Sequence, residues 1–153
     1  MSNLKFSLAG TNETAARFVG KTRNFQLIVD EPEGLGGTDS AANPVEYILA
    51  GYAGCINVVG HLVAKELNIN LNKLKIEIEG EINPARLFGK PSADRAGYLY
   101  IHVNLKPETD ASDEQLAEWI SEVEYRCPVN DNLSNATPIN VTVEKETPTE
   151  LAA

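Results

Sequence analysis

The longest run without a charged side chain lies in the middle of the chain. Within residues 43–68, no Asp, Glu, Lys or Arg occurs between Glu46 and Lys65. The run is far longer than a strand, and it opens with Asn43-Pro44, an N-cap followed by proline at the first helical position, so it predicts a helix. Apolar residues cover most of its circumference, and a helix that is apolar all round must be enclosed by other structure. We expect a second helix as its neighbour.

This uncharged run of 18 residues also has nearly the length of a membrane span. Two polar residues, Asn57 and His61, interrupt it, and its glycines weaken it as a lone helix. Its flanks lack the Lys and Arg clusters and the aromatic belts that fix a span. We therefore favour a helix buried in a folded domain.

Alternating apolar and polar residues predict strands on both sides of this helix. The expected strands are a weak one near residues 4–8, then residues 25–31, 74–82, 98–106 and 138–146. Residues 74–82 and 98–106 are expected to pair antiparallel. The glycine-rich loop after Pro32 lacks both the Gly-Lys-Ser/Thr of a phosphate loop and the dinucleotide fingerprint, so it does not indicate phosphate binding.

A second helix is predicted after Pro107. Ser112 or Asp113 can cap it, and its apolar residues are spaced for one buried stripe. It runs into Cys127-Pro128, where proline fits the first position of another helical turn. Cys127 would then be an N-cap, where backbone N–H groups and the helix dipole favour a thiolate, so we expect a thiol that is more acidic than usual.

The order of these elements predicts an α+β fold with antiparallel sheet packed around helices. A chain of 153 residues fits a single domain over residues 1–153, with a frayed tail over residues 147–153. The net charge of −9 and the absence of a basic run argue against nucleic acid and anionic membranes as partners. The first 20 residues hold no secretory signal, so we expect a cytoplasmic protein.

The two cysteines are the candidates for chemistry. Cys55 and Cys127 are too far apart in sequence for a zinc motif, His61 lies about 240° around the helix from Cys55, and no metal site is expected. Both thiols could be packed as small hydrophobic residues. The polar context of Cys127 and the glycine-lined position of Cys55 favour a working pair instead.

Three segments together resemble the OsmC / organic hydroperoxide resistance (Ohr) family. They are DEPEGLGGTDSAANP, NPVEYILAGYAGC and, some seventy residues later, RCPV. The resemblance implies intertwined homodimers of α+β fold. It also implies that a first cysteine attacks a hydroperoxide and that a second cysteine resolves the sulfenic acid as a disulfide. Lipoyl or other external thiols then restore the reduced state, and no bound cofactor is implied.

Carried onto this chain, the resemblance makes Cys55 the peroxidatic thiol and Cys127 the resolving thiol. For this chemistry the two Cα atoms must come within about 7 Å. Tyr52, Val59 and Leu62 would form an apolar wall around Cys55, which suits an organic hydroperoxide better than hydrogen peroxide.

The resemblance is incomplete at the residues that assist the thiol. The family has a glutamate ten residues before the first cysteine, where this chain has Val45. Glu46 lies about 13–14 Å along the helix from Cys55, so it could act only from a partner subunit. Arg17 or Arg23 is expected to supply the family's arginine, with Arg17 preferred. Each of these charges could instead be an ordinary solvated or helix-terminal group.

The sequence therefore predicts a thiol-dependent peroxidase that reduces organic hydroperoxides in oxidative stress defence. Two alternatives stay open. One is a protein of the same fold that binds a small hydrophobic or electrophilic molecule without turnover. The other is a redox sensor whose disulfide forms but is not recycled.

Overall fold

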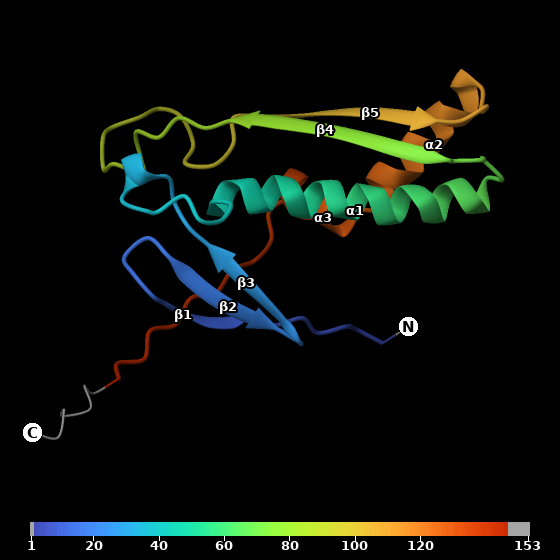
Figure 1. The fold of residues 1–153 in the computed structure, drawn as a ribbon. Coiled ribbons are helices and arrows are strands. Elements are labelled where there is room, and N and C mark those ends of the chain that lie inside the picture. The colour runs from blue at the N-terminus through green and yellow to red at the C-terminus, as the bar shows by residue number, and fades with distance from the viewer. Residues whose placement is uncertain (1, 147–153) are drawn as a thin grey trace, which may run out of the picture.

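The computed structural model describes residues 2–146, which form two antiparallel sheets and three helices (Figure 1). The first sheet consists of β1 (Ala9–Asn12), β2 (Phe18–Thr22) and β3 (Phe25–Val29), and the second of β4 (Lys73–Glu81) and β5 (Tyr100–Glu108). The helices are α1 (Pro44–Glu66), α2 (Asp113–Arg126) and α3 (Pro128–Ser134), with a short 3-10 turn η1 (Glu33–Leu35). The predicted α+β class is confirmed.

The long helix α1 begins where the sequence predicts. The Asn43 side chain accepts a hydrogen bond from the Glu46 N–H at 2.9 Å, and the Glu46 carboxylate accepts one from the Asn43 N–H at 2.8 Å. This capping box satisfies two backbone donors that a helix start leaves free, and Pro44 follows at the first helical position. The start of α1, and with it the position of Cys55, is therefore fixed locally.

One face of α1 packs against β4, β5 and α2 to form the core. The buried apolar residues are Ile56, Val59, Val63, Ala64, Ile69, Trp119, Val123 and Cys127. Gly60 lets the indole of Trp119 approach α1, because a Cβ at Gly60 would lie 3.1 Å from the ring. Trp119 Nε1 donates to the Gly60 carbonyl at 2.8 Å, so the buried indole N–H is satisfied. The expected neighbouring helix is α2.

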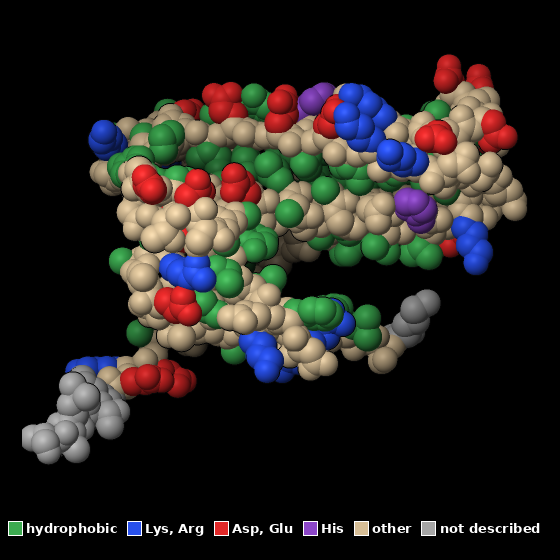
Figure 2. Space-filling view, viewed as in Figure 1, with side chains coloured by type: hydrophobic (Ala, Val, Ile, Leu, Met, Phe, Trp, Pro, Cys, Tyr) green, Lys and Arg blue, Asp and Glu red, His purple; other side chains and the backbone are tan. Residues whose placement is uncertain are grey.

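The opposite face of α1 is not covered by the described residues of this chain, so the structure that the sequence predicts around the helix is only partly supplied here. Ile48, Val58 and Leu62 are 41%, 58% and 51% exposed. Figure 2 shows apolar side chains on this side of α1, facing an open space above the sheet β1–β3. The cause is the arrangement of the chain, because the first sheet projects away from α1 instead of packing on it (Figure 1).

The length and composition of α1 are also those of a membrane-crossing helix, with a mean hydropathy of 1.5 over its most apolar 18 residues. Within the fold, 33% of that window is buried. The core helix of a folded domain meets the same criterion, and α1 supplies four of the eight buried apolar residues of this core.

Strand predictions are confirmed in the middle of the chain and wrong at its ends. β4 and β5 pair antiparallel as predicted, with Ile76 opposite Leu105. The strand expected at residues 4–8 is instead β1, which begins at Ala9, and β2 was not predicted. Residues 138–146 form no strand, and Val141 is 80% exposed, because no described strand of this chain lies beside them. The predicted tail over residues 147–153 lies outside the described residues.

Candidate active site

The fold brings the two cysteines into contact. Cys127 Sγ lies 2.6 Å from Cys55 Sγ, although 72 positions separate them in the chain. Cys55 lies on α1 at the border between its buried face and its exposed face, and its side chain is partly exposed. Cys127 stands between α2 and α3 and is 1% exposed. Each sulfur is therefore within reach of the other without any movement of the backbone.

Cys127 occupies the helix start that the sequence predicts. Its N–H donates to the Val123 carbonyl at 3.0 Å, which closes α2, and its sulfur accepts a hydrogen bond from the Asn130 N–H at 3.4 Å, which opens α3. Pro128 takes the first position of α3. The Cys127 sulfur is therefore the N-cap acceptor of α3.

The environment of Cys55 disfavours its thiolate. Burial raises the pKa of the Cys55 thiol above its ordinary value, the hydrogen bond with Cys127 raises it further, and a backbone hydrogen bond from Val129 lowers it in part. No arginine of the described residues is among these influences. A thiol with a raised pKa has less thiolate at neutral pH, so the single chain does not by itself activate Cys55.

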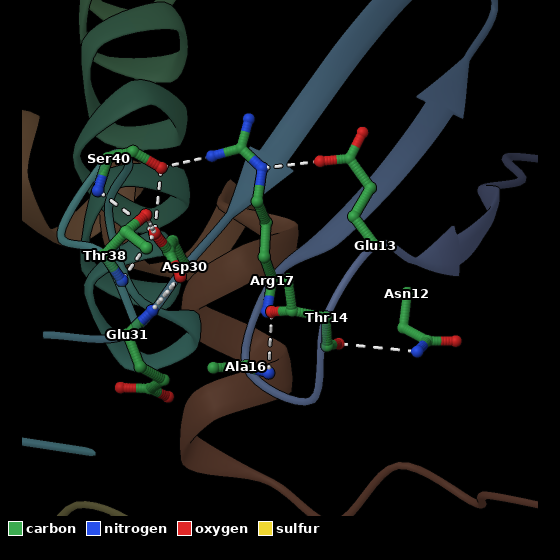
Figure 3. Close-up of polar contacts among 9 residues, drawn as sticks. All are labelled: Asn12, Glu13, Thr14, Ala16, Arg17, Asp30, Glu31, Thr38 and Ser40. Carbon is green, nitrogen blue, oxygen red and sulfur yellow. Dashed lines mark hydrogen bonds and ion pairs between the residues drawn. The ribbon is translucent and has the colours of Figure 1, made fainter. Parts of the chain in front are cut away.

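The residues expected to assist Cys55 lie elsewhere in this chain. Arg17 Nε pairs with Glu13 at 2.7 Å, and the same guanidinium donates to the Ser40 hydroxyl (Figure 3). The Arg23 guanidinium lies 5.0 Å from the centre of the Phe25 ring. Glu46 is held in the capping box of α1. Within one chain the structure gives none of these three candidates a contact with either cysteine.

The glycine-rich loop before α1 folds around a carboxylate that sequence reasoning missed (Figure 3). Asp30 has no exposed surface, and it is covered by its own loop. One of its oxygens accepts from the N–H groups and hydroxyls of Thr38 and Ser40 at 2.7–3.2 Å, and the other accepts from the Glu31 N–H at 2.9 Å. These hydrogen bonds, with that of the Thr38 hydroxyl foremost, hold the pKa of Asp30 far below its ordinary value.

Two further features tie this loop to the fold. Gly37 is required by a close approach, because a Cβ there would lie 1.8 Å from the Glu31 carbonyl oxygen. The Arg17 hydrogen bond to Ser40 links the loop to the turn before β2. The loop therefore orders the chain between the first sheet and α1, which is a structural role. An Asp followed closely by Gly, Thr and Ser is the sequence signal that could have indicated it.

An apolar cavity of about 340 Å³ opens beside Cys127, between α1, α2 and β5. It is lined by Tyr52, Ile56, Val103, Leu105, Pro107, Leu116, Trp119, Ile120, Val123, Glu124, Cys127 and Asn130. Of the three residues expected to contact substrate, only Tyr52 lines it. Val59 is packed in the core and Leu62 is on the exposed face of α1, because helix periodicity turns these side chains away from the cavity. The predicted apolar stripe of α2 supplies four of the wall residues that were missed, Leu116, Trp119, Ile120 and Val123.

A second cavity, of about 280 Å³, shares Tyr52 and Asn130 with the first. Its lining is Tyr52, Arg95, Tyr98, Leu99, Tyr100, Ile101, Asn130, Leu133 and Ser134. The Tyr52 hydroxyl donates to Asn130 Oδ1 at 2.7 Å, so this hydrogen bond lies where the two cavities meet. Burial raises the pKa of Tyr52, and negative charge on Cys127 would raise it further, so its hydroxyl stays a donor near the sulfur pair.

Within residues 2–146, no group of three His, Cys, Asp or Glu side chains is placed to hold a metal ion. His61 does not approach the cysteines through its ring nitrogens. Its Nδ1 lies 2.7 Å from the Asn57 carbonyl one turn earlier on α1.

Comparison with known proteins agrees on one family. Residues 37–142 match the family described as OsmC-like protein. A hydroperoxide reductase of Mycoplasma genitalium is 27% identical over 121 residues, which cover 78% of this chain and 80% of that protein. The crystal structure of an OsmC-like protein from Mycoplasma pneumoniae superposes with a TM-score of 0.75 at 21% identity, over 87% of this chain and 89% of that chain. An organic hydroperoxide resistance protein from Elizabethkingia anophelis gives a TM-score of 0.63 at 21% identity, over 86% and 89%.

Proposed function

The chain belongs to the OsmC-like protein family, and we propose that it is a thiol-dependent peroxidase that detoxifies organic hydroperoxides. The single observation that carries this proposal is the contact between Cys55 Sγ and Cys127 Sγ, 2.6 Å apart beside an apolar cavity. Relatives named hydroperoxide reductase support the same activity. Two thiols in contact are the arrangement that a sulfenic acid and disulfide cycle requires.

The proposed cycle begins at Cys55. Its thiolate attacks the outer oxygen of the hydroperoxide, the O–O bond breaks, and the departing alkoxide takes a proton and leaves as an alcohol. Cys55 is then a sulfenic acid. The Cys127 thiolate attacks the Cys55 sulfur, hydroxide leaves and is protonated to water, and a disulfide forms. An external dithiol, such as a dihydrolipoyl group, reduces this disulfide to two thiols and is itself oxidised to a disulfide.

The cavity supports an organic substrate. Its volume of about 340 Å³ and its aliphatic and aromatic lining suit a hydrocarbon group, which hydrogen peroxide does not have. Cys127 is part of the lining, so a hydrocarbon group in the cavity lies against the sulfur that contacts Cys55. We place Tyr52 in contact with the substrate there.

We further propose that the protein works as a homodimer. The exposed face of α1 carries the apolar residues Ile48, Val58 and Leu62, and the apolar residues of segment 138–146 have no neighbouring strand in the described chain. A second copy would cover both. It would also bring a second set of Arg17, Arg23 and Glu46, and we assign the activation of Cys55 to Arg17 or Arg23 with Glu46 of the partner subunit. A nearby guanidinium lowers the pKa of a thiol, which would offset the effect of burial.

Turnover of cumene hydroperoxide with dihydrolipoamide tests the peroxidase proposal. The wild-type protein is expected to consume the hydroperoxide catalytically, and Cys55→Ser is expected to abolish turnover. His61→Ala is the matched control, because this polar residue of α1 has no contact with the sulfurs through its ring. Undiminished turnover by Cys55→Ser would remove Cys55 from the mechanism.

One observation favours a different function, which is binding without turnover. The raised pKa of Cys55 describes an unreactive thiol beside an apolar cavity. If iodoacetamide alkylates Cys55 only above about pH 8.5, the value of a free thiol, the binding function is favoured. A redox sensor is distinguished by a disulfide that forms stoichiometrically with hydroperoxide and is not reduced by lipoyl thiols.

A further inference from the structure

The side chain of Asn130 joins the three helices that surround the sulfur pair. Its Oδ1 accepts a hydrogen bond from the Tyr52 hydroxyl of α1 at 2.7 Å, and its Nδ2 donates to the Glu124 carbonyl of α2 at 3.0 Å. The backbone N–H of the same residue donates to Cys127 Sγ at 3.4 Å. Asn130 therefore contacts α1, α2 and the cysteine between α2 and α3.

The contact with α2 replaces a hydrogen bond that proline removes. In a continuous helix the Glu124 carbonyl would accept from the N–H of residue 128, four positions later. Residue 128 is proline, which has no N–H, so the backbone offers this carbonyl no helical partner. The Asn130 side chain supplies the missing donor. The proline that begins α3 thus makes the end of α2 depend on Asn130.

The corner between α2 and α3 has little buried apolar packing beyond Cys127. The two helices meet at this one residue, whose backbone is extended with φ −78° and ψ 111°. No residue of α3 is buried, and Val129 is only partly buried against the core. The Val129 N–H also makes a hydrogen bond to the sulfur of Cys55. Because the start of α3 contacts both sulfurs, a rotation of this corner would move one sulfur relative to the other.

We propose that Asn130 is the positioning residue of the resolving step, in which the disulfide forms. Asn130 holds the corner against Tyr52 and Glu124. Cys127 Sγ is thereby kept directed at Cys55 Sγ, which raises the effective concentration of one sulfur at the other. In this step the Cys127 thiolate attacks the Cys55 sulfenic acid, an S–S bond forms, the S–O bond breaks, and hydroxide leaves and is protonated to water. The reaction rests on the proposed peroxidase function, but the positioning of the sulfurs does not.

The equilibrium between dithiol and disulfide tests this positioning without a hydroperoxide. The protein is equilibrated with mixtures of reduced and oxidised dithiothreitol, and the disulfide fraction is measured by alkylation and mass spectrometry. Asn130→Ala is expected to lower the equilibrium constant for the disulfide about tenfold, which raises its reduction potential by about 30 mV. A loss of stability that is equal in the reduced and oxidised proteins leaves the potential unchanged, so this readout is specific for positioning.

The matched control is Asn132→Ala, which removes the same kind of side chain from the same helix. The Asn132 side chain bonds to the Pro128 carbonyl and to the Thr137 hydroxyl, not to α1 or α2. The potential of this variant should equal that of the wild type. An Asn130→Ala potential equal to that of the wild type would overturn the inference.

Tyr52→Phe tests the same contact from α1, because it removes only the hydroxyl. It should raise the potential in the wild-type background and change it little in the Asn130→Ala background, since the hydrogen bond between the two side chains is then already absent. Fully additive effects of the two substitutions would show that they do not act through one contact and would contradict the inference.

The fate of the sulfenic acid provides a kinetic readout. It either condenses with Cys127 or reacts with a second hydroperoxide molecule, which becomes an alcohol while the Cys55 sulfur becomes a sulfinic acid. The ratio of the two products at one concentration of cumene hydroperoxide does not depend on how fast the sulfenic acid forms. Asn130→Ala is expected to give about tenfold more sulfinic acid relative to disulfide than the wild type or Asn132→Ala.

The two readouts separate this inference from the proposed function. An unchanged product ratio in Asn130→Ala would show that Asn130 does not control the resolving step and would overturn the inference. If the wild-type protein does not react with the hydroperoxide but its potential depends on Asn130, the peroxidase proposal fails and the positioning of the sulfurs by Asn130 stands.

Discussion

Cys127 Sγ lies 2.6 Å from Cys55 Sγ because the end of α2 and the start of α3 both occur at Cys127, directly against the middle of α1. The contact depends on two local features of the sequence. Pro128 starts α3 immediately after the cysteine, and the glycine at position 60 admits Trp119, which holds α2 against α1.

The serine variants of the two cysteines are expected to give different products with a hydroperoxide. Cys127→Ser should react once with cumene hydroperoxide and stop as the sulfenic acid of Cys55, because no second thiol resolves it. Trapping with dimedone and peptide mass spectrometry should place one adduct on Cys55. Cys55→Ser should form no such adduct at a comparable rate. A fast dimedone adduct on Cys127 in Cys55→Ser would reverse the proposed roles.

The exposed face of α1 should control both assembly and thiol acidity. Val58→Glu places a charge in this apolar face, where Val58 is 58% exposed, and is expected to give a monomer by light scattering. Burial raises the pKa of Cys55 in the single chain, so losing a partner's arginine should shift the pH profile of bromobimane labelling to higher pH. Less thiolate is then present at neutral pH, and labelling at pH 7 should slow.

The matched control for this experiment is Ser121→Glu, which adds the same charge to the exposed side of α2. It should change neither the mass nor the pH profile. A Val58→Glu protein with the mass and profile of the wild type would exclude a dimer through this face.

Asp30 should stabilise the protein in a pH-dependent way. Its pKa in the folded state is below the unfolded value of 3.8, so its contribution is complete above about pH 3.8 and is lost as the pH falls toward the folded pKa. Asp30→Asn should therefore lower Tm at pH 7, and the difference from the wild type should shrink between pH 4 and pH 2. Comparing the two proteins cancels other acid-sensitive groups such as Glu77, whose pKa is lowered to about 2 by Lys106 and Lys75. A Tm difference that does not change with pH would contradict this role.

Alanine substitution at two glycines of the same loop should have different effects on the free energy of unfolding. Gly37→Ala forces a Cβ against the Glu31 carbonyl and is expected to cost about 1–3 kcal/mol in the free energy of unfolding. A Cβ at Gly34 has no atom within 4 Å, so Gly34→Ala should change the free energy of unfolding by less than about 0.5 kcal/mol. Urea unfolding followed by circular dichroism measures both. Similar losses of unfolding free energy in the two variants would show that the loop backbone can move at Gly37 and would contradict this prediction.

The sequence predicted well those elements that local signals determine. The start of α1 at Asn43-Pro44, the start of α2 at Ser112 and the helix start at Cys127 all depend on side chains within one turn of the position. The alternation in β4 and β5 was clear because each strand has one partly buried and one exposed face. A resemblance over two cysteine segments added the pairing of Cys55 with Cys127.

The predictions that disagree with the structure share one cause. They concern residues whose surroundings depend on contacts between distant parts of the chain or with another molecule. The apolar residues of segment 138–146 and of the outer face of α1 signal burial, but nothing in the described chain covers them. Leu62 lies on the exposed face of α1 and not at the cavity, because helix position alone does not say which face meets α2. Arg95 lies in an irregular connection, where spacing carries no information about the cavity that it lines.

Peptide mass spectrometry after one equivalent of hydroperoxide tests the central claim most directly. Reduced protein is treated with cumene hydroperoxide, alkylated under denaturing conditions and digested. The peroxidase mechanism predicts a disulfide between Cys55 and Cys127 within one chain, loss of both free thiols and their recovery after dihydrolipoamide. Alkylation of both cysteines as free thiols, with the hydroperoxide either untouched or consumed, would contradict it.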